Sequence, residues 1–320
     1  MSFAPTVGVA LGKIPHSALL TGVGLTLRLA QGLGLHHAPP PETPRDEVTL
    51  RHEIWARVIW QDSLLSISYD RATPTTAMTT WDATTGPGPE GFTYADCMLR
   101  LCTIALDVVG NRRAPMTTQR EVQRIETRRE EVRAIGRQAS GHLRESSACT
   151  SLKHHLEHWN WHMHRSYVVS ELCRPMLAKR SDRHDDEVRR LRSVCIEALA
   201  DTVEAFLHLQ NLTVFARTSW AAVHRSLSSA LLLGILKESA RDSRVRSLLD
   251  RLIAVMSSME YMDASEVPAP VARAVTALVQ LNETEGGEFS ASPSDEGSPH
   301  QQMQNILWGS ATSSGFSSLY

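Results

Sequence analysis

The densest group of residues that could do chemistry is the run HHLEHWNWHMH at residues 154–164. His154, His158 and His162 recur every four residues, so they share one helix face at the spacing that two metal ligands on a helix use. A metal site needs ligands from elsewhere too, and the glutamate of the metalloprotease pattern HExxH is absent because His155 follows His154. We interpret the run as a polar, partly buried helix face, with a metal-dependent enzyme as an alternative.

Other catalytic signatures are absent from the sequence. No GxSxG nucleophile motif and no Walker-type phosphate loop occurs, and Asp185 and Asp186 stand in a charged run where solvation explains them. A dinucleotide-binding loop would need a third glycine after Gly22 and Gly24, but Leu27 stands at that position. We therefore expect a protein that is not an enzyme and that carries no cofactor.

Composition and charge narrow the class of this 320-residue chain. A net charge of -2 gives no global attraction for nucleic acid or for an anionic membrane. The five cysteines are odd in number and widely scattered, which is typical of reduced, buried thiols inside a cell. The longest apolar run, residues 230–236, is far shorter than the ~20 residues that span a bilayer. These features predict a cytosolic or nuclear protein with no membrane segment.

A second group of polar residues lies in the segment that begins at Leu50. Its apolar residues recur at three- and four-residue spacing, as on one face of a helix, and Asp62 falls on or beside that face. A buried carboxylate requires a partner, because burying a charge alone is costly. The candidate partners are Arg28, Arg57 and Arg71, and we interpret the group as structural rather than catalytic.

The apolar patterns favour an all-α fold, because no segment shows the alternation of paired strands. We expect an irregular multi-helix bundle: an N-terminal segment at 1–16, a helical regulatory domain at 17–282 and a tail at 283–320. The tail is rich in Gly, Ser, Pro, Gln and acidic residues, which predicts disorder. Residues 72–92, rich in Thr, Pro and Gly, predict a long ordered loop. The expected helices span 17–35, 94–109, 117–144, 150–177, 188–209, 219–239, 244–262 and 271–282, with a further one from Leu50 onward.

The expected helix at 117–144 carries an apolar seam with the three-four spacing of a coiled coil, interrupted by Arg129 and Gly136. A helix lying on its own domain is one interpretation, and a homodimer through a short coiled coil is the alternative. Its arginines alternate with glutamates, so ion pairs along the helix surface explain them better than nucleic-acid binding does. The arginines are Arg120, Arg124, Arg128, Arg129, Arg133 and Arg137.

Taken in order, several motifs resemble the regulatory middle homology domain of fungal-specific transcription factors, the region that normally follows a binuclear zinc cluster. A helix ends in Leu-Gly-Leu-His at residues 33–36, and a second helix carries arginines, two tryptophans and a downstream aspartate. Residues 70–72 are similar to the family's Gly-Arg-Pro exit, with Ala72 in place of proline, and residues 172–175 are similar to its Leu-His-Arg-Pro element. The apolar segment 219–236 is similar to the family's late helix. The signature residues are Leu35, His36, Glu53, Trp55, Trp60, Asp62, Arg71, Arg174 and Pro175.

This resemblance, which covers about residues 17–240, implies a nuclear regulator of transcription that controls a metabolic or secondary-metabolite gene set. The signature residues are then expected to pack and pair, and the partners to be other transcription factors or co-regulators. A binuclear zinc cluster needs six cysteines at paired spacing, which this sequence does not contain, so DNA binding is expected only if an upstream zinc cluster or a partner supplies it. The alternative is an interaction partner of a complete zinc-cluster factor that does not itself bind DNA.

Overall fold

The computed structural model shows an all-α protein, as predicted. Within the described residues the chain contains no strand, only isolated bridges near residues 88–92 and 139. Most of the expected N-terminal segment and most of the expected long loop lie outside those residues. The structure describes residues 16–69, 87–111, 116–179, 186–214, 216, 219–260, 269–283 and 298–308.

The helices divide between two compact units, where one domain over 17–282 was expected. One unit spans Ile14–Leu172, and the other holds the chain from Cys173 onward. The difference has a physical cause: apolar helix faces in each half pack on faces of the same half, and single cores stop growing at a few hundred residues.

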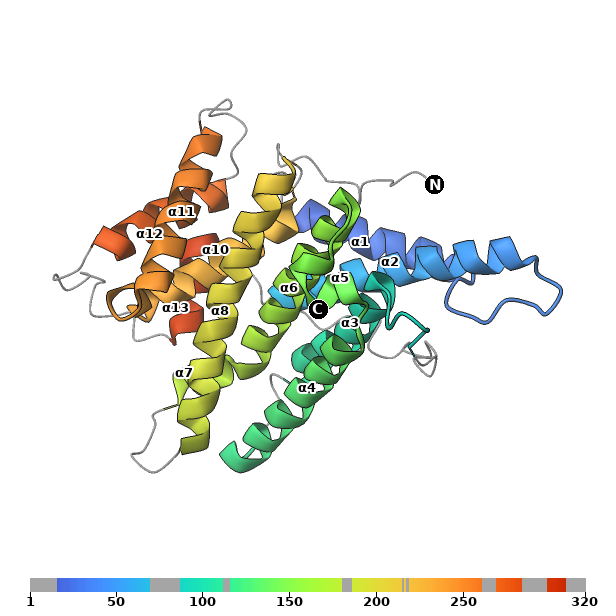
Figure 1. Cartoon of the computed structure of the whole chain (residues 1–320), viewed down its shortest axis with the longest axis horizontal. Coiled ribbons are helices and arrows are strands. Elements are labelled where there is room, and N and C mark those ends of the chain that lie inside the picture. The colour runs from blue at the N-terminus through green and yellow to red at the C-terminus, as the bar shows by residue number, and fades with distance from the viewer. Residues whose placement is uncertain are drawn as a thin grey trace, which may run out of the picture. The chain divides into compact units, whose positions relative to one another are not determined.

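The first unit is built from consecutive helices that pack on their neighbours in sequence. α1 packs beside α2, α2 beside α3, and α3 beside α4 (Figure 1). The four-residue helix α5 follows α4 directly, and the long helix α6 ends the unit. The bounds are α1 His16–Gly32, α2 Arg45–Tyr69, α3 Tyr94–Asn111, α4 Thr118–Gln138, α5 Gly141–Arg144 and α6 Leu152–Cys173.

A glycine-based cap ends α1. Gly34 has φ +65°, the left-handed conformation that a residue with a Cβ rarely adopts. Its N–H bonds to Gln31 O at 2.9 Å, and the N–H of Leu35 bonds to Ala30 O at 3.0 Å, which is the hydrogen-bond pattern of a Schellman motif. The buried Leu35 side chain supplies the apolar contact that accompanies this motif. The cap therefore fixes the direction in which the chain leaves α1.

The single helix expected at 117–144 is wrong, because α4 ends at Gln138 and α5 begins at Gly141. Ala139 and Ser140 are extended, and Phe92 pairs with this stretch: its N–H donates to Gln138 O at 2.7 Å, and its carbonyl accepts from Ser140 N at 2.9 Å. Gly91 permits the approach, since a Cβ there would lie 2.6 Å from Gln138 O. A contact distant in sequence thus interrupts the helical pattern.

The apolar seam of α4 faces its own unit. Val122, Ile125 and Val132 are buried, and α4 packs against α3. This arrangement matches the interpretation of a helix lying on its own domain.

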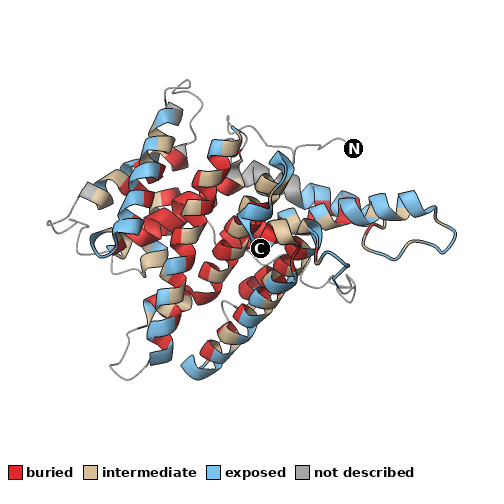
Figure 2. Cartoon of the chain, in the orientation of Figure 1, coloured by how far each residue is buried: buried red, intermediate tan, exposed pale blue. Residues whose placement is uncertain are grey.

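The second unit is organised around α10, whose side chains are almost all buried (Figure 2). α8, α12 and α13 all pack against it, and α11 packs against α8 and α12. The run SLSSALLL at 226–233 places serines and leucines on every side of the helix, and each of these residues is buried. The bounds are α7 Pro175–Ala178, α8 Asp186–Leu212, α10 Trp220–Ile235, α11 Ser243–Glu260, α12 Ala269–Glu283 and α13 Pro299–Trp308.

The prediction of a disordered tail over 283–320 is wrong for residues 299–308, which form α13. This helix packs on α10 and α12, and its Met303 and Leu307 side chains are buried. Arg273 of α12 holds its C-terminal end, because Nη2 donates to Leu307 O at 2.9 Å and Nε to Ile306 O at 3.4 Å. Composition alone missed the helix because its apolar residues are few and its partners lie far away in sequence.

The cysteines agree with the prediction of reduced thiols. All five are free, and four of them are buried. Burial raises the pKa of the Cys97 thiol to about 12, so this thiol is protonated and unreactive. None of the described helices is long and apolar enough to cross a lipid bilayer.

Candidate functional site

The signature residues at the α1–α2 corner hold the two helices together. Arg51 of α2 donates from Nη2 to Gly34 O at 3.2 Å and to Leu33 O at 3.3 Å, which satisfies carbonyls at the end of α1. The His36 ring lies 5.9 Å from the buried Trp55 ring. Glu53 is exposed and pairs with Arg57 on the same helix. The corner thus joins the two helices through backbone carbonyls and a contact between rings.

Farther along α2, Trp60 makes edge contacts with two rings, Tyr94 at 5.3 Å and His164 at 6.2 Å between centroids. Asp62 is buried, as predicted. Buried serines on this part of the helix bond to the carbonyl four residues earlier, and Ser66 Oγ donates to Asp62 O at 2.6 Å. The group is therefore part of a polar but packed helix face.

Two of the candidate partners of Asp62 make contacts within their own helices. Arg57 pairs with Glu53 at 3.4 Å, and Arg28 bonds to Gln31 at 3.4 Å. Both arginines are directed to residues of their own helix, one turn away. Arg71, the third candidate, lies outside the described residues.

The Arg174–Pro175 element belongs to the second unit and joins its beginning to its end. Pro175 occupies the first position of α7, where its fixed φ suits a helix start. The largely buried Arg174 bonds through Nη1 to His300 Nδ1 of α13 at 2.9 Å. The element thus connects the start of α7 to α13.

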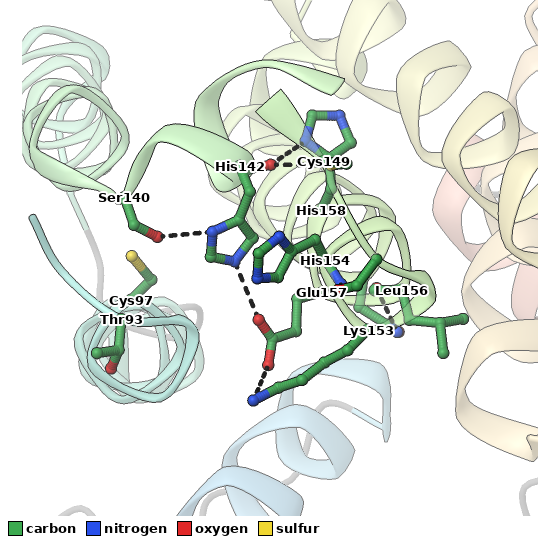
Figure 3. A network of polar contacts seen from close by, with 12 residues as sticks. Thr93, Cys97, Ser140, His142, Cys149, Lys153, His154, Leu156, Glu157 and His158 are labelled. Atoms are coloured by element: carbon green, nitrogen blue, oxygen red, sulfur yellow. Dashed lines mark hydrogen bonds and ion pairs between the residues drawn. The ribbon is translucent and has the colours of Figure 1, made fainter. Parts of the chain in front are cut away.

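The histidine face of α6 braces the short helix α5 (Figure 3). His158 Nδ1 donates to His142 O at 2.7 Å, and the His162 ring lies near the backbone of Leu143. The last carbonyls of a helix have no partner within it, and a four-residue helix consists almost entirely of such ends. His158 therefore satisfies the His142 carbonyl of α5.

A second set of contacts surrounds the His142 ring, which reaches back toward α6. Its Nε2 lies 3.0 Å from Glu157 Oε2, and its Nδ1 lies 3.3 Å from Ser140 Oγ. The ring stacks on His154, with centroids 4.3 Å apart. Lys153 Nζ completes the set at 3.6 Å from Glu157 Oε1. Figure 3 shows these side chains converging between α5 and α6.

Electrostatics keep the inner histidines neutral. Burial lowers the pKa of His158, and burial with the nearby Arg165 charge lowers the pKa of His162 to about 3. Within the described part of the chain, His162 Nε2 is buried without a hydrogen-bond partner, so protonation would bury an unpaired N–H. A neutral ring fits a group that donates to a carbonyl.

The three predicted metal-ligand candidates are not arranged as ligands. His158 and His162 are directed to backbone groups of α5, while His154 Nδ1 accepts from the Thr150 amide at 3.4 Å. Across the described ranges, no three His, Cys, Asp or Glu side chains are placed to hold one metal ion. The structure therefore brings these histidines together as a brace rather than as a coordination set.

Sequence reasoning missed His142, Glu157 and Ser140, although they complete the network. The i, i+4 rule relates residues on one helix, whereas the partner here comes from a separate short helix. It also missed Arg144 and Arg165, which join the arginines of α4 around a surface cavity described below. No spacing in the sequence relates those positions.

Comparison of the chain with protein-family models, with curated proteins and with solved structures finds no match. The family resemblance accordingly rests on the sequence motifs of this chain alone.

Proposed function

We propose that this chain is a transcription regulator of fungal type that controls a metabolic or secondary-metabolite gene set and acts in the nucleus. The observation that supports the proposal is the α1–α2 corner. The Leu-Gly-Leu-His motif forms the cap of α1, Arg51 binds its carbonyls, and Trp55 packs near His36. Motif residues that resemble a regulatory domain thus contact one another instead of lining a reactive centre.

Regulation in this proposal works by a shift between conformations of the helical region, biased by a ligand or partner. DNA would be reached through a zinc cluster or a partner outside this sequence. The tail, with α13 docked on α10 and α12, is the segment whose release could change what a co-regulator contacts.

A reporter assay tests the proposal. The full chain is fused to a heterologous DNA-binding domain, and reporter output is compared with that domain alone. We expect a change in output, and Arg51→Met should alter it because the α1 cap loses its partner. Arg57→Met is the matched control, since Arg57 is an exposed arginine of the same helix. No response from the full chain or from residues 283–320 would contradict an activator, and equal effects of both variants would contradict a role for the corner.

A second candidate function, an interaction partner of a complete zinc-cluster factor, is favoured by exposed apolar side chains on α1 and α2. Leu25, Leu29 and Leu33 are one turn apart and 60–68% exposed, and Leu50 and Ile54 are exposed on α2. Such residues gathered on one hairpin suit a protein contact.

Sedimentation of the chain with a purified zinc-cluster factor from the same genome tests this candidate. A complex is expected with the native chain, and the double variant Leu29→Glu with Leu33→Glu should abolish it without loss of helix content. Two independent sedimenting species with the native chain would exclude the candidate for that factor.

A further inference from the structure

Four arginines converge on one surface cavity of the first unit. The cavity has a volume of about 580 Å³ and is lined by Arg133, Gly136 and Arg137 of α4, Arg144 of α5 and Arg165 of α6. Its volume falls in the range of small-molecule sites, about 300–1,000 Å³. Unlike typical sites of that kind, its wall consists of guanidinium groups rather than apolar side chains.

The glycine in this wall has a structural reason. A Cβ at Gly136 would lie 3.3 Å from Nη1 of Arg165, closer than side chains normally approach. The Arg165 guanidinium therefore lies against the backbone of α4, inside the cavity wall. The residue that interrupts the apolar seam of α4 is the one that admits this arginine.

A glutamate of α4 pairs with two of the lining arginines. Glu130 contacts Arg137 at 2.7 Å and Arg133 at 3.5 Å. All three side chains are more than half exposed, so these ion pairs are weak and a stronger anion can replace the carboxylate. Among the described residues, no carboxylate pairs with Arg144.

We propose that this cavity binds a small molecule that carries two or more phosphate groups. Guanidinium groups offer paired N–H donors that match phosphate oxygens, and several of them together favour a multiply charged anion. The lining contains no aromatic ring, so the site recognises the phosphates rather than a base attached to them. Three helices supply the arginines at one point, which suits a compact anion better than the extended backbone of duplex DNA.

Binding at this site is independent of the proposed role in transcription, because it is measured on the purified full chain. The probe is sodium pyrophosphate, followed by isothermal titration calorimetry at low ionic strength, where charge interactions are least screened. We expect saturable binding at one site per chain.

Variants that remove one charge define the site. Arg144→Met and Arg165→Met should each weaken binding about tenfold or more, as expected for loss of a charged hydrogen bond worth at least ~1.4 kcal/mol. Glu130→Gln should strengthen binding because the competing carboxylate is gone. Arg120→Met is the matched control: Arg120 is an exposed arginine of α4 that does not line the cavity, and its loss should leave the affinity unchanged.

Three further titrations identify the anion. Vesicles of phosphatidylcholine with and without phosphatidylinositol 4,5-bisphosphate show whether the phosphates can belong to a lipid headgroup. Binding only to the vesicles that contain the bisphosphate would extend the site to lipids, and pyrophosphate binding without vesicle binding would restrict it to free anions. Both results support a polyphosphate site. Citrate binding more tightly than pyrophosphate would overturn the phosphate assignment. Duplex DNA binding that depends on Arg144 and Arg165, without pyrophosphate binding, would overturn the compact ligand. The proposal also fails if pyrophosphate does not bind, or if Arg120→Met weakens pyrophosphate binding as much as Arg144→Met does.

Discussion

The histidine face of α6 and the arginine cavity beside it are both dense in residues that could do chemistry, but they use them in opposite ways. His158 and His162 are directed inward: the His142 carbonyl of α5 accepts a hydrogen bond from His158, and the His162 ring lies near the backbone of Leu143. The lining arginines present charge to solvent, with one weakly held carboxylate between two of them. The histidine face is packed against a neighbouring short helix, whereas the cavity keeps exposed guanidinium groups at the surface.

Replacing a bracing histidine should give the largest effect. His158→Ala removes a buried ring and the donor to His142 O, so we expect a loss of about 2–4 kcal/mol in the free energy of unfolding. Denaturant titration followed by circular dichroism measures it. His155→Ala is the control, because His155 lies on the same helix with a half-buried ring. It should lower the free energy of unfolding less than His158→Ala does. Equal costs at the two positions would show that the brace is not a particular role of His158.

The same inward face should make stability depend on pH. The folded pKa of His162 is about 3, against 6.5 for an ordinary ring, so between these values the unfolded chain binds a proton that the folded chain does not. The contribution of neutral His162 to the free energy of unfolding is almost fully present above pH 6.5. It falls as the pH is lowered, by about 1–2 kcal/mol from pH 7 to pH 5. Denaturant titrations at these two pH values should show a smaller difference for His162→Gln, and an unchanged difference would refute this source of the dependence.

The stability lost on replacing an arginine of α4 or α5 should depend on whether its side chain faces the protein or the solvent. Arg128 points to α3, where it binds Asp107 at 3.0 Å, and this pair raises the pKa of Arg128. Arg128→Met should therefore cost about 1–2 kcal/mol of stability. Arg144→Met, at the exposed cavity wall, should cost less than about 0.5 kcal/mol. Thermal unfolding compares the two variants. A large loss of stability in Arg144→Met would mean that Arg144 is a structural residue.

Local pattern predicted much of this fold. The helix periods and the Leu33–His36 motif are properties of adjacent residues, and the cap that Gly34 forms lies within a few positions of α1. The break between α4 and α5 depends on Phe92, and α13 depends on Arg273, so neither can be read from the segment itself. The cavity was beyond prediction for the same reason, because its arginines come from three helices that only tertiary packing brings together.

The docking of α13 changes how the end of this chain should be regarded. A ten-residue helix is too short to persist alone in water, so α13 exists by virtue of the α10 and α12 surface that it covers. Without Met303 and Leu307, part of that surface would be exposed to solvent. A truncation before residue 299 would therefore act as a core mutation, because it removes the buried side chains with which α13 covers α10 and α12.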